Sequence, residues 1–130
     1  MSKEANESLA KAAHGGYVGT LNIDAIFETV KLNEWATLIM SRMLMRKGLV
    51  EVVGPNHSFG ASPSLDKLIK HCEESSLVPN DLLADLERLR EVTFFAEWWN
   101  GRAPTKGEWK WALANCKSII ERLFDLQAVA

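Results

Sequence analysis

The stretch of sequence that decides the fold is residues 79–124, PNDLLADLERLREVTFFAEWWNGRAPTKGEWKWALANCKSIIERLF. Its apolar residues recur at helical spacing on both sides of a short polar connection, NGRAP, at 100–104. This pattern predicts two long amphipathic helices, over 79–99 and 106–127, that fold back on each other. Thr105 and Glu108 match the capping-box pattern, which marks the expected start of the second helix.

The segment before this pair also predicts helices. The run 22–47 contains no Gly or Pro, so we expect a long helix there, capped by Asn22 and ended by Gly48, with a break near 31–33 as an alternative. Residues 49–53, LVEVV, form the one segment with β-like composition.

A short helix is expected over 63–74, with Ser62 as its cap and Pro63 in its first position. Together the four helices predict an all-α fold: a four-to-five-helix up-and-down bundle. We place the bundle in one domain, residues 22–130, after a short polar N-terminal arm over 1–21.

Composition limits the class of protein. The chain has 130 residues, of which 47% are hydrophobic and 25% charged, and its formal net charge is −2. One folded domain fits these values, and the acidic balance lacks the basic footprint of a non-specific nucleic-acid binder, although a local basic surface is left open. No run is long and apolar enough for a membrane span or a secretory signal, so we expect a cytoplasmic protein.

Three segments carry a family resemblance, and their order and spacing matter more than any one of them. The expected long helix ends in LMRKG at 44–48. A loop with His57 leads into SLDKLI at 64–69, and PNDLL at 79–83 leads on to RAPT at 102–105. In this order the segments resemble the HEPN superfamily, the helical bundles related to the C-terminal domain of kanamycin nucleotidyltransferase. The resemblance implies a helical bundle and a homodimer.

The same resemblance argues against the activity of many family members. HEPN ribonucleases have an Arg-x(4–6)-His motif, and no Arg precedes a His at that spacing here. Glu97 stands where the family's Ala-Arg-Tyr segment would supply Arg. The resemblance therefore implies a dimeric interaction or accessory protein, in a toxin–antitoxin or nucleotidyltransferase-linked system, with a small nucleotidyltransferase as a possible type of partner.

The candidates for ligand binding are Arg90, Glu97, Trp98, Trp99, Arg102, Lys106 and Lys110, and they include two groups. Arg102, Lys106 and Lys110 lie at helical spacing around the expected start of the last helix, where backbone N–H groups favour phosphate. Trp98 and Trp99 could stack on bases or anchor a protein partner. The alternatives are a solvated face for the cations, and packing at the end of the bundle for the tryptophans.

Other chemistry has weaker support in the sequence. The residues His57, His71, Cys72 and Cys116 have no metal-binding spacing, and both cysteines lie on apolar helical faces, so we expect reduced thiols, no metal site and no cofactor. A ribonuclease with a rearranged site would have to use Arg88, Arg90, Arg102 and His57. A DNA-binding regulator would need residues 49–53 to form a strand after the long helix, as in a winged helix.

The expected homodimer has an aromatic interface. On helical wheels Phe95 and Trp111 point about 200° away from the core stripes of their helices, and one of Trp98 and Trp99 should do the same. We therefore predict that Phe95, Trp99 and Trp111 are exposed in one molecule and are buried against the same residues of a second copy across a two-fold axis.

Overall fold

The structure is a computed structural model, and it describes residues 20–54, 64–96 and 103–129. Every element in these ranges is helical, which confirms the all-α bundle. The elements are α2 (Thr20–Val30), α3 (Glu34–Val53), α4 (Leu65–Glu74), α5 (Asn80–Val92), the 3-10 turn η1 (Phe94–Ala96) and α6 (Lys106–Val129). No helix in the described ranges is long and apolar enough to cross a membrane.

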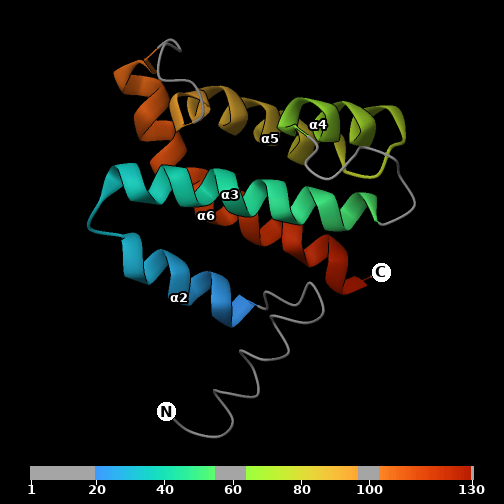
Figure 1. Cartoon of the computed structure of the whole chain (residues 1–130), viewed down its shortest axis with the longest axis horizontal. Helices are drawn as coiled ribbons and strands as arrows, with labels where there is room; N and C mark the ends of the chain where they lie inside the picture. Colours follow the sequence, from blue (N-terminus) through green and yellow to red (C-terminus); the bar gives the residue numbers. More distant parts are fainter. Residues whose placement is uncertain (1–19, 55–63, 97–102, 130) are drawn as a thin grey trace, which may run out of the picture.

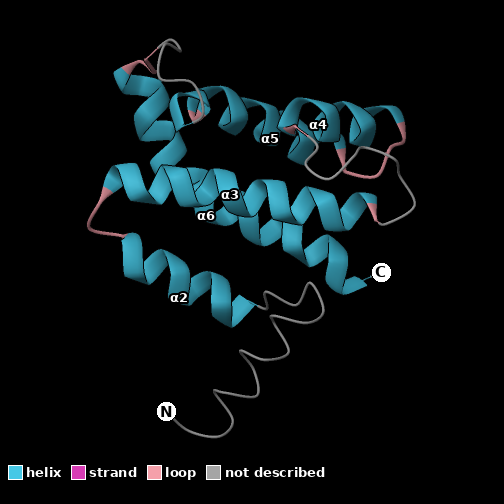
Figure 2. Ribbon diagram, viewed as in Figure 1, coloured by secondary structure: helices cyan, strands magenta, loops and turns pink. Residues whose placement is uncertain are grey.

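The bundle is organised around the pair α3 and α6. In Figure 1, α3 lies at the front with α6 running diagonally behind it, α2 lies below them, and α4 and α5 lie above. Short connections reverse the chain between α2 and α3 and between α4 and α5 (Figure 2). The core therefore lies between α3, α6 and the α4–α5 pair.

The expected long helix is two helices, with the break at 31–33. Asn33 caps α3, because its Oδ1 accepts a hydrogen bond from the Ala36 backbone N–H over 3.0 Å. Asn22 lies inside α2 and is not its cap, and Thr20 and Leu21 are helical, so the described helices begin before the predicted boundary at 22. Most of the predicted arm, 1–19, lies outside the described residues.

Gly48 does not end α3, and residues 49–53 are not a strand. The helix continues to Val53 and ends at Gly54, whose φ of 81° is a conformation that glycine adopts readily. Leu49 and Val53 continue the buried stripe of Leu38 and Met45, so core burial favours helix over the β-preference of this segment. Gly48 is buried against Leu123 and Phe124 of α6.

Two further boundaries differ from prediction. Ser64, and not Ser62, caps α4 by accepting from the Lys67 backbone N–H over 3.3 Å. Helix α5 ends at Val92, well short of the predicted end at 99. The Thr93 hydroxyl, directly after the helix, donates to the Leu89 carbonyl over 2.7 Å. Thr93 is β-branched, its hydroxyl bonds back to the helix, and aromatic residues follow it. These features favour the end of the helix at this point, and η1 follows.

The capping box before α6 is confirmed: Glu108 N–H donates to Thr105 Oγ1 over 3.1 Å, and Thr105 N–H donates to Glu108 Oε1 over 2.9 Å.

The predicted core stripes are largely confirmed. Residues at i, i+3, i+4 and i+7 of α4 are buried, and α5 and α6 bury the positions that their periodicity indicates. The buried side chains of these three helices are Leu65, Leu68, Ile69, Cys72, Leu82, Leu83, Leu86, Leu89, Val92, Ala112, Cys116, Ile119, Ile120, Leu123 and Phe124. This core positions the starts of α3 and α6 beside each other.

Candidate functional site

Three aromatic rings meet at the end of the bundle where α3 and α6 begin. Trp35 of α3 contacts Phe95 of η1 edge to face, with ring centroids 4.8 Å apart, and contacts Trp109 of α6 with centroids 5.0 Å apart. Phe95 and Trp109 are 5.6 Å apart. These separations and angles are those of favourable aromatic pairs. We call Trp35, Phe95 and Trp109 the aromatic cluster.

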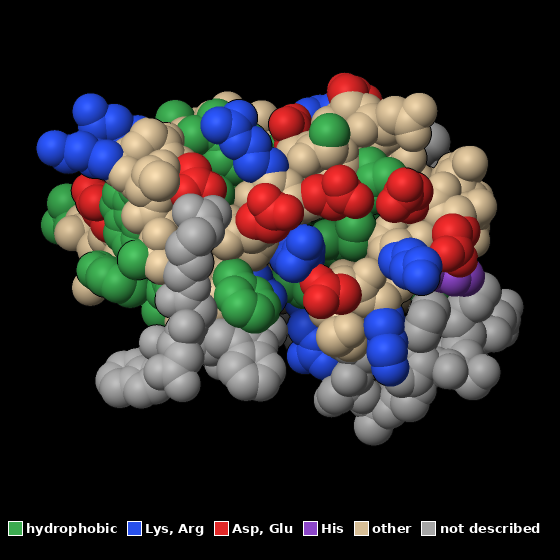
Figure 3. Space-filling view, turned by 90° about the horizontal axis from the view of Figure 1, so that it is seen from above, with side chains coloured by type: hydrophobic (Ala, Val, Ile, Leu, Met, Phe, Trp, Pro, Cys, Tyr) green, Lys and Arg blue, Asp and Glu red, His purple; other side chains and the backbone are tan. Residues whose placement is uncertain are grey.

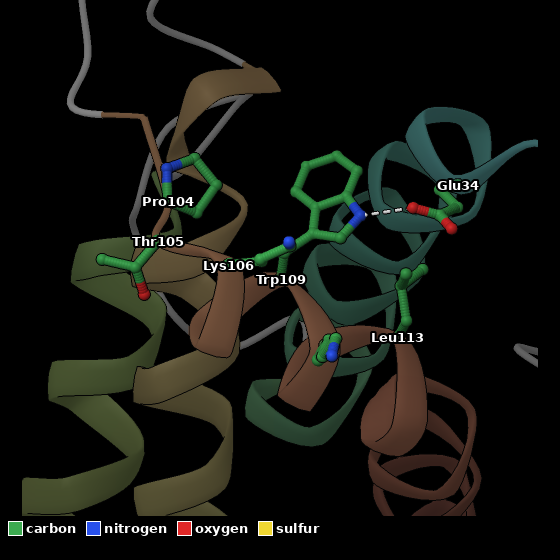
Figure 4. Close-up of a pocket in the computed structure, with 7 residues that line it drawn as sticks. Glu34, Pro104, Thr105, Lys106, Trp109 and Leu113 are labelled. Atoms are coloured by element: carbon green, nitrogen blue, oxygen red, sulfur yellow. Dashed lines mark hydrogen bonds between the residues drawn. The ribbon is translucent and has the colours of Figure 1, made fainter.

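A hollow of about 330 Å³ lies beside the aromatic cluster (Figure 4). The indole Nε1–H of Trp109 donates to Glu34 Oε1 over 2.6 Å, which links the first turns of α6 and α3 across this hollow. The capping box positions Trp109, because it fixes the first turn of α6 one residue before it. The lining residues are Glu34, Pro104, Thr105, Lys106, Trp109, Lys110 and Leu113.

Two of the predicted basic residues come together here. Lys106 and Lys110 are exposed, one turn apart, and line the hollow, with Glu34 as the nearby acid. The backbone N–H groups of Thr105 and Glu108 already donate to the capping box, so they do not contribute to an anion site. The hollow has an aromatic wall and a rim that carries charges of both signs.

Arg90, the one other binding candidate in the described ranges, does not line this hollow. Arg90 pairs with Asp66 of α4 over 2.9 Å, and the Arg88 guanidinium lies 4.1 Å from the centre of the Trp111 ring. Two of the three arginines of the rearranged ribonuclease site therefore make contacts within the fold. Glu97, Trp98, Trp99, Arg102 and His57 lie outside the described residues.

The predicted exposure of Phe95 and Trp111 is wrong. Both are half-buried and pack against the core. Phe95 belongs to a 3-10 turn and not to α5, so its direction differs from the helical wheel, and Trp35 covers it. Trp111 lies beside the core stripe of α6, but the Arg88 side chain of α5 covers its ring. The two rings leave little aromatic surface for the interface that the sequence predicts.

The exposed apolar surface is instead on α3. Trp35 is 58% exposed, Met43 61%, Ile39 40% and Val50 41%, and Leu32 in the turn before the helix is 93% exposed. Sequence reasoning missed this surface because it looked for the exposed aromatic residues only after residue 94 and read Val50 as part of a β-like segment. The signal was present: α3 is apolar nearly all round, and such a helix requires partners on more than one side.

Charged residues gather on another face of the molecule, seen from above in Figure 3. Acidic side chains gather over the face formed by α4 and α5, with Lys and Arg between them (Figure 3). Arg122 of α6 bridges Asp81 and Asp85 of α5, with N–O distances of 2.6 and 3.2 Å, and so offsets the repulsion of that i, i+4 acidic pair. This face is the solvated side of the bundle.

Both cysteines are buried thiols, as predicted, and within the described ranges no three His, Cys, Asp or Glu side chains are close enough to share a metal ion. Burial raises the pKa of Cys72 from 9.0 to about 11, and it also raises the pKa of Cys116. A thiolate is the reactive form of cysteine. Because burial keeps both thiols protonated at neutral pH, neither cysteine is a nucleophile there.

This burial predicts slow thiol labelling. At pH 8 we expect the two thiols to react with a disulfide reagent far more slowly in the folded chain than in denaturant, by about a hundredfold for Cys72 from its thiolate fraction alone. Because the folded pKa of Cys72 is the higher one, its contribution to stability is complete below pH 9 and declines as pH rises toward 11. The exposed variant Glu73→Cys is the control, and native labelling as fast as that control contradicts the prediction.

Comparison with protein-family models, with curated proteins and with solved structures gives no match for this chain. The resemblance to the HEPN superfamily thus rests on the three sequence segments described above, and the function is inferred from the surface of the bundle.

Proposed function

We propose that this chain is a HEPN-like helical interaction domain that acts as a homodimer and as an accessory subunit, in a toxin–antitoxin or nucleotidyltransferase-linked system. The observation that supports the proposal best is the exposed apolar side of α3. A large exposed apolar patch on a small domain is typical of a protein interface. Its tryptophan and methionine residues are types enriched at such contacts.

The hollow beside the aromatic cluster adds a second contact region at the same end. Trp35 lies next to both regions, because its ring contacts Trp109, which lines the hollow, and it begins the apolar side of α3. An accessory subunit needs one surface for its own copy and another for its partner protein. The rim of Lys106, Lys110 and Glu34 supplies polar groups of both signs for the second purpose.

One alternative function loses the feature that suggested it. The winged-helix interpretation needs a strand at 49–53, and this segment is the last part of α3. The rearranged ribonuclease stays an alternative, in which Arg88 and Arg90 would have to leave their contacts with Trp111 and Asp66 to reach a substrate. Incubation with total RNA, with Arg90→Ala as the control, tests the second alternative: cleavage that is lost in the variant contradicts a purely accessory role.

The proposal predicts a concentration-dependent dimer. Sedimentation of the whole chain from about 1 to 100 micromolar, a range that brackets modest protein affinities, should show a shift from monomer toward dimer mass. A mass that remains that of the monomer over the whole range contradicts the proposed homodimer.

A further inference from the structure

The hollow beside the aromatic cluster combines an apolar wall with a charged rim (Figure 4). Pro104, Trp109 and Leu113 form the wall, and each of them is half-buried. Lys106 and Lys110 stand at the rim, exposed and one turn of α6 apart. An apolar centre inside a polar rim is typical of a protein contact built around one anchoring side chain.

The hollow is small and open to solvent. Its volume of about 330 Å³ is at the lower end of the range for ligand pockets, and four of its seven lining residues are exposed. A small molecule would keep much of its surface in water here, whereas small-molecule sites normally bury most of their ligand. One apolar side chain of a longer segment fits better, because the rest of that segment continues across the rim.

The charged side chains that line the hollow sum to one positive charge. Lys106 and Lys110 make no ion pair with the described residues, and Glu34 is the single acid in the lining. Glu34 Oε1 already accepts from the Trp109 indole N–H over 2.6 Å. Glu108, in the first turn of α6, does not line the hollow, and its Oε1 accepts a backbone N–H of the capping box. Two unpaired ammonium groups beside one engaged carboxylate favour an acidic occupant.

An acidic protein segment suits this lining better than a nucleic acid. Glu34 repels a phosphate placed beside it, and two lysines fall short of the basic face with which domains usually bind a polyanion. A peptide offers carboxylates to the lysines and also a backbone N–H to Glu34. The second carboxylate oxygen of Glu34, Oε2, makes no hydrogen bond with the described residues, so it is available as an acceptor.

We propose that the hollow is the docking site for an acidic segment of a partner protein. One large apolar side chain of that segment packs on Trp109 and Leu113, and neighbouring Asp or Glu residues pair with Lys106 and Lys110. This inference rests on the proposed function, because it states which kind of segment the partner of the accessory subunit presents. The aromatic cluster and Glu34 hold the Trp109 ring in place, so the anchor meets an ordered surface.

Peptide binding to the whole chain tests the anchor and its charge. The probe is a fluorescent peptide, SDEFEDS, and its matched controls lack the acids (SNQFQNS) or the anchor (SDEAEDS). One anchor and exposed ion pairs give a weak contact, so the probe should bind with a dissociation constant on the order of 10 to 100 micromolar at low salt. Each control should bind at least about fivefold more weakly, because it loses either the ion pairs or the buried apolar area.

Three results overturn the proposal. The first is no binding of SDEFEDS up to about 1 mM, a limit well above the expected constant. The second is equal binding of SDEFEDS and SNQFQNS, because acidity then has no role. The third is tighter binding of a single-stranded oligothymidylate of similar length, which identifies a nucleic-acid surface.

Charge reversal locates the contact. Lys110→Glu should raise the dissociation constant of SDEFEDS by about tenfold or more, and the double variant Lys106→Glu with Lys110→Glu should bind the basic peptide SKRFRKS instead. Lys67→Glu on α4 is the control, because it changes the net charge equally but lies outside the hollow. All three lysines are exposed, and helical content shows whether each variant is folded. A folded Lys110→Glu chain that binds SDEFEDS like the original chain places the contact elsewhere and overturns the proposal.

The docking site and the homodimer can fail separately. A chain that dimerises in sedimentation but does not prefer the acidic peptide loses the docking site and keeps the homodimer. A monomeric chain that binds SDEFEDS through Lys110 keeps the docking site and loses the homodimer.

Discussion

Arg42→Ala should lower the free energy of unfolding by about 3 kcal/mol, because it removes a charged hydrogen-bonding group from the core. Arg42 is only 5% exposed, although it belongs to the middle of α3. Its Nη1 donates to the Arg90 carbonyl over 2.8 Å and to Thr93 Oγ1 over 3.2 Å. Removal of the Arg42 side chain leaves both acceptors without this donor and opens a cavity.

The position of these acceptors adds to the effect. The Arg90 carbonyl is in the last turn of α5, where carbonyls lack partners within the helix and the macrodipole favours a positive charge. Thr93, fully buried at the end of α5, donates its hydroxyl to the Leu89 carbonyl and accepts from Arg42. Arg42 therefore joins α3 to the end of α5, and its loss should fray that end first.

Urea denaturation of matched variants measures the contribution of Arg42. Arg42→Met keeps much of the apolar stem but not the donors, so it should lose less stability than Arg42→Ala. Lys47→Ala, on the exposed side of the same helix, should change stability by less than about 0.5 kcal/mol. Arg42→Ala within that same small range shows that the guanidinium does not stabilise the bundle.

The sequence predicted the parts of the fold that depend on local pattern. The stripe of Leu82, Leu86 and Leu89 and the capping box of Thr105 and Glu108 are each visible within one or two turns of helix, and the structure confirms both. Lys106 and Lys110 were predicted to lie on one side of α6 for the same reason, and the structure places both beside the hollow.

The failures arose where a distant part of the chain decides the outcome. Gly48 reads locally as a helix end, and only the approach of Leu123 shows why a residue without a side chain lies inside α3. Phe95 reads as exposed on a helical wheel, but Trp35, sixty positions earlier in the chain, covers it. Such contacts depend on how the helices pack against one another. The spacing of residues along one helix does not predict that packing.

The close approach at Gly48 predicts opposite results for the same substitution at two glycines. Gly48 and Gly107 both lie in helices, α3 and α6, and Ala favours a helix over Gly by up to about 1 kcal/mol at each. At Gly107 an added Cβ comes no nearer than 4.0 Å to Thr105 Oγ1. Gly107→Ala should therefore be neutral or slightly stabilising.

At Gly48 the packing cost should exceed the gain in helix propensity. An added Cβ would lie 2.7 Å from Leu123 Cδ2 and 2.9 Å from Leu123 Cγ, and Leu123 is fully buried, so it has little room to move. Overpacking of a core costs about 1–3 kcal/mol, so Gly48→Ala should destabilise the chain by about 1–2 kcal/mol and Gly48→Leu by about 3 kcal/mol or more. In the double variant Gly48→Ala with Leu123→Ala, the loss should be smaller than the sum of the two single losses, because the smaller side chain makes room for the new methyl group. Chemical denaturation of the five variants measures these differences, and a Gly48→Ala chain as stable as Gly107→Ala would show that α3 and α6 are further apart at this point.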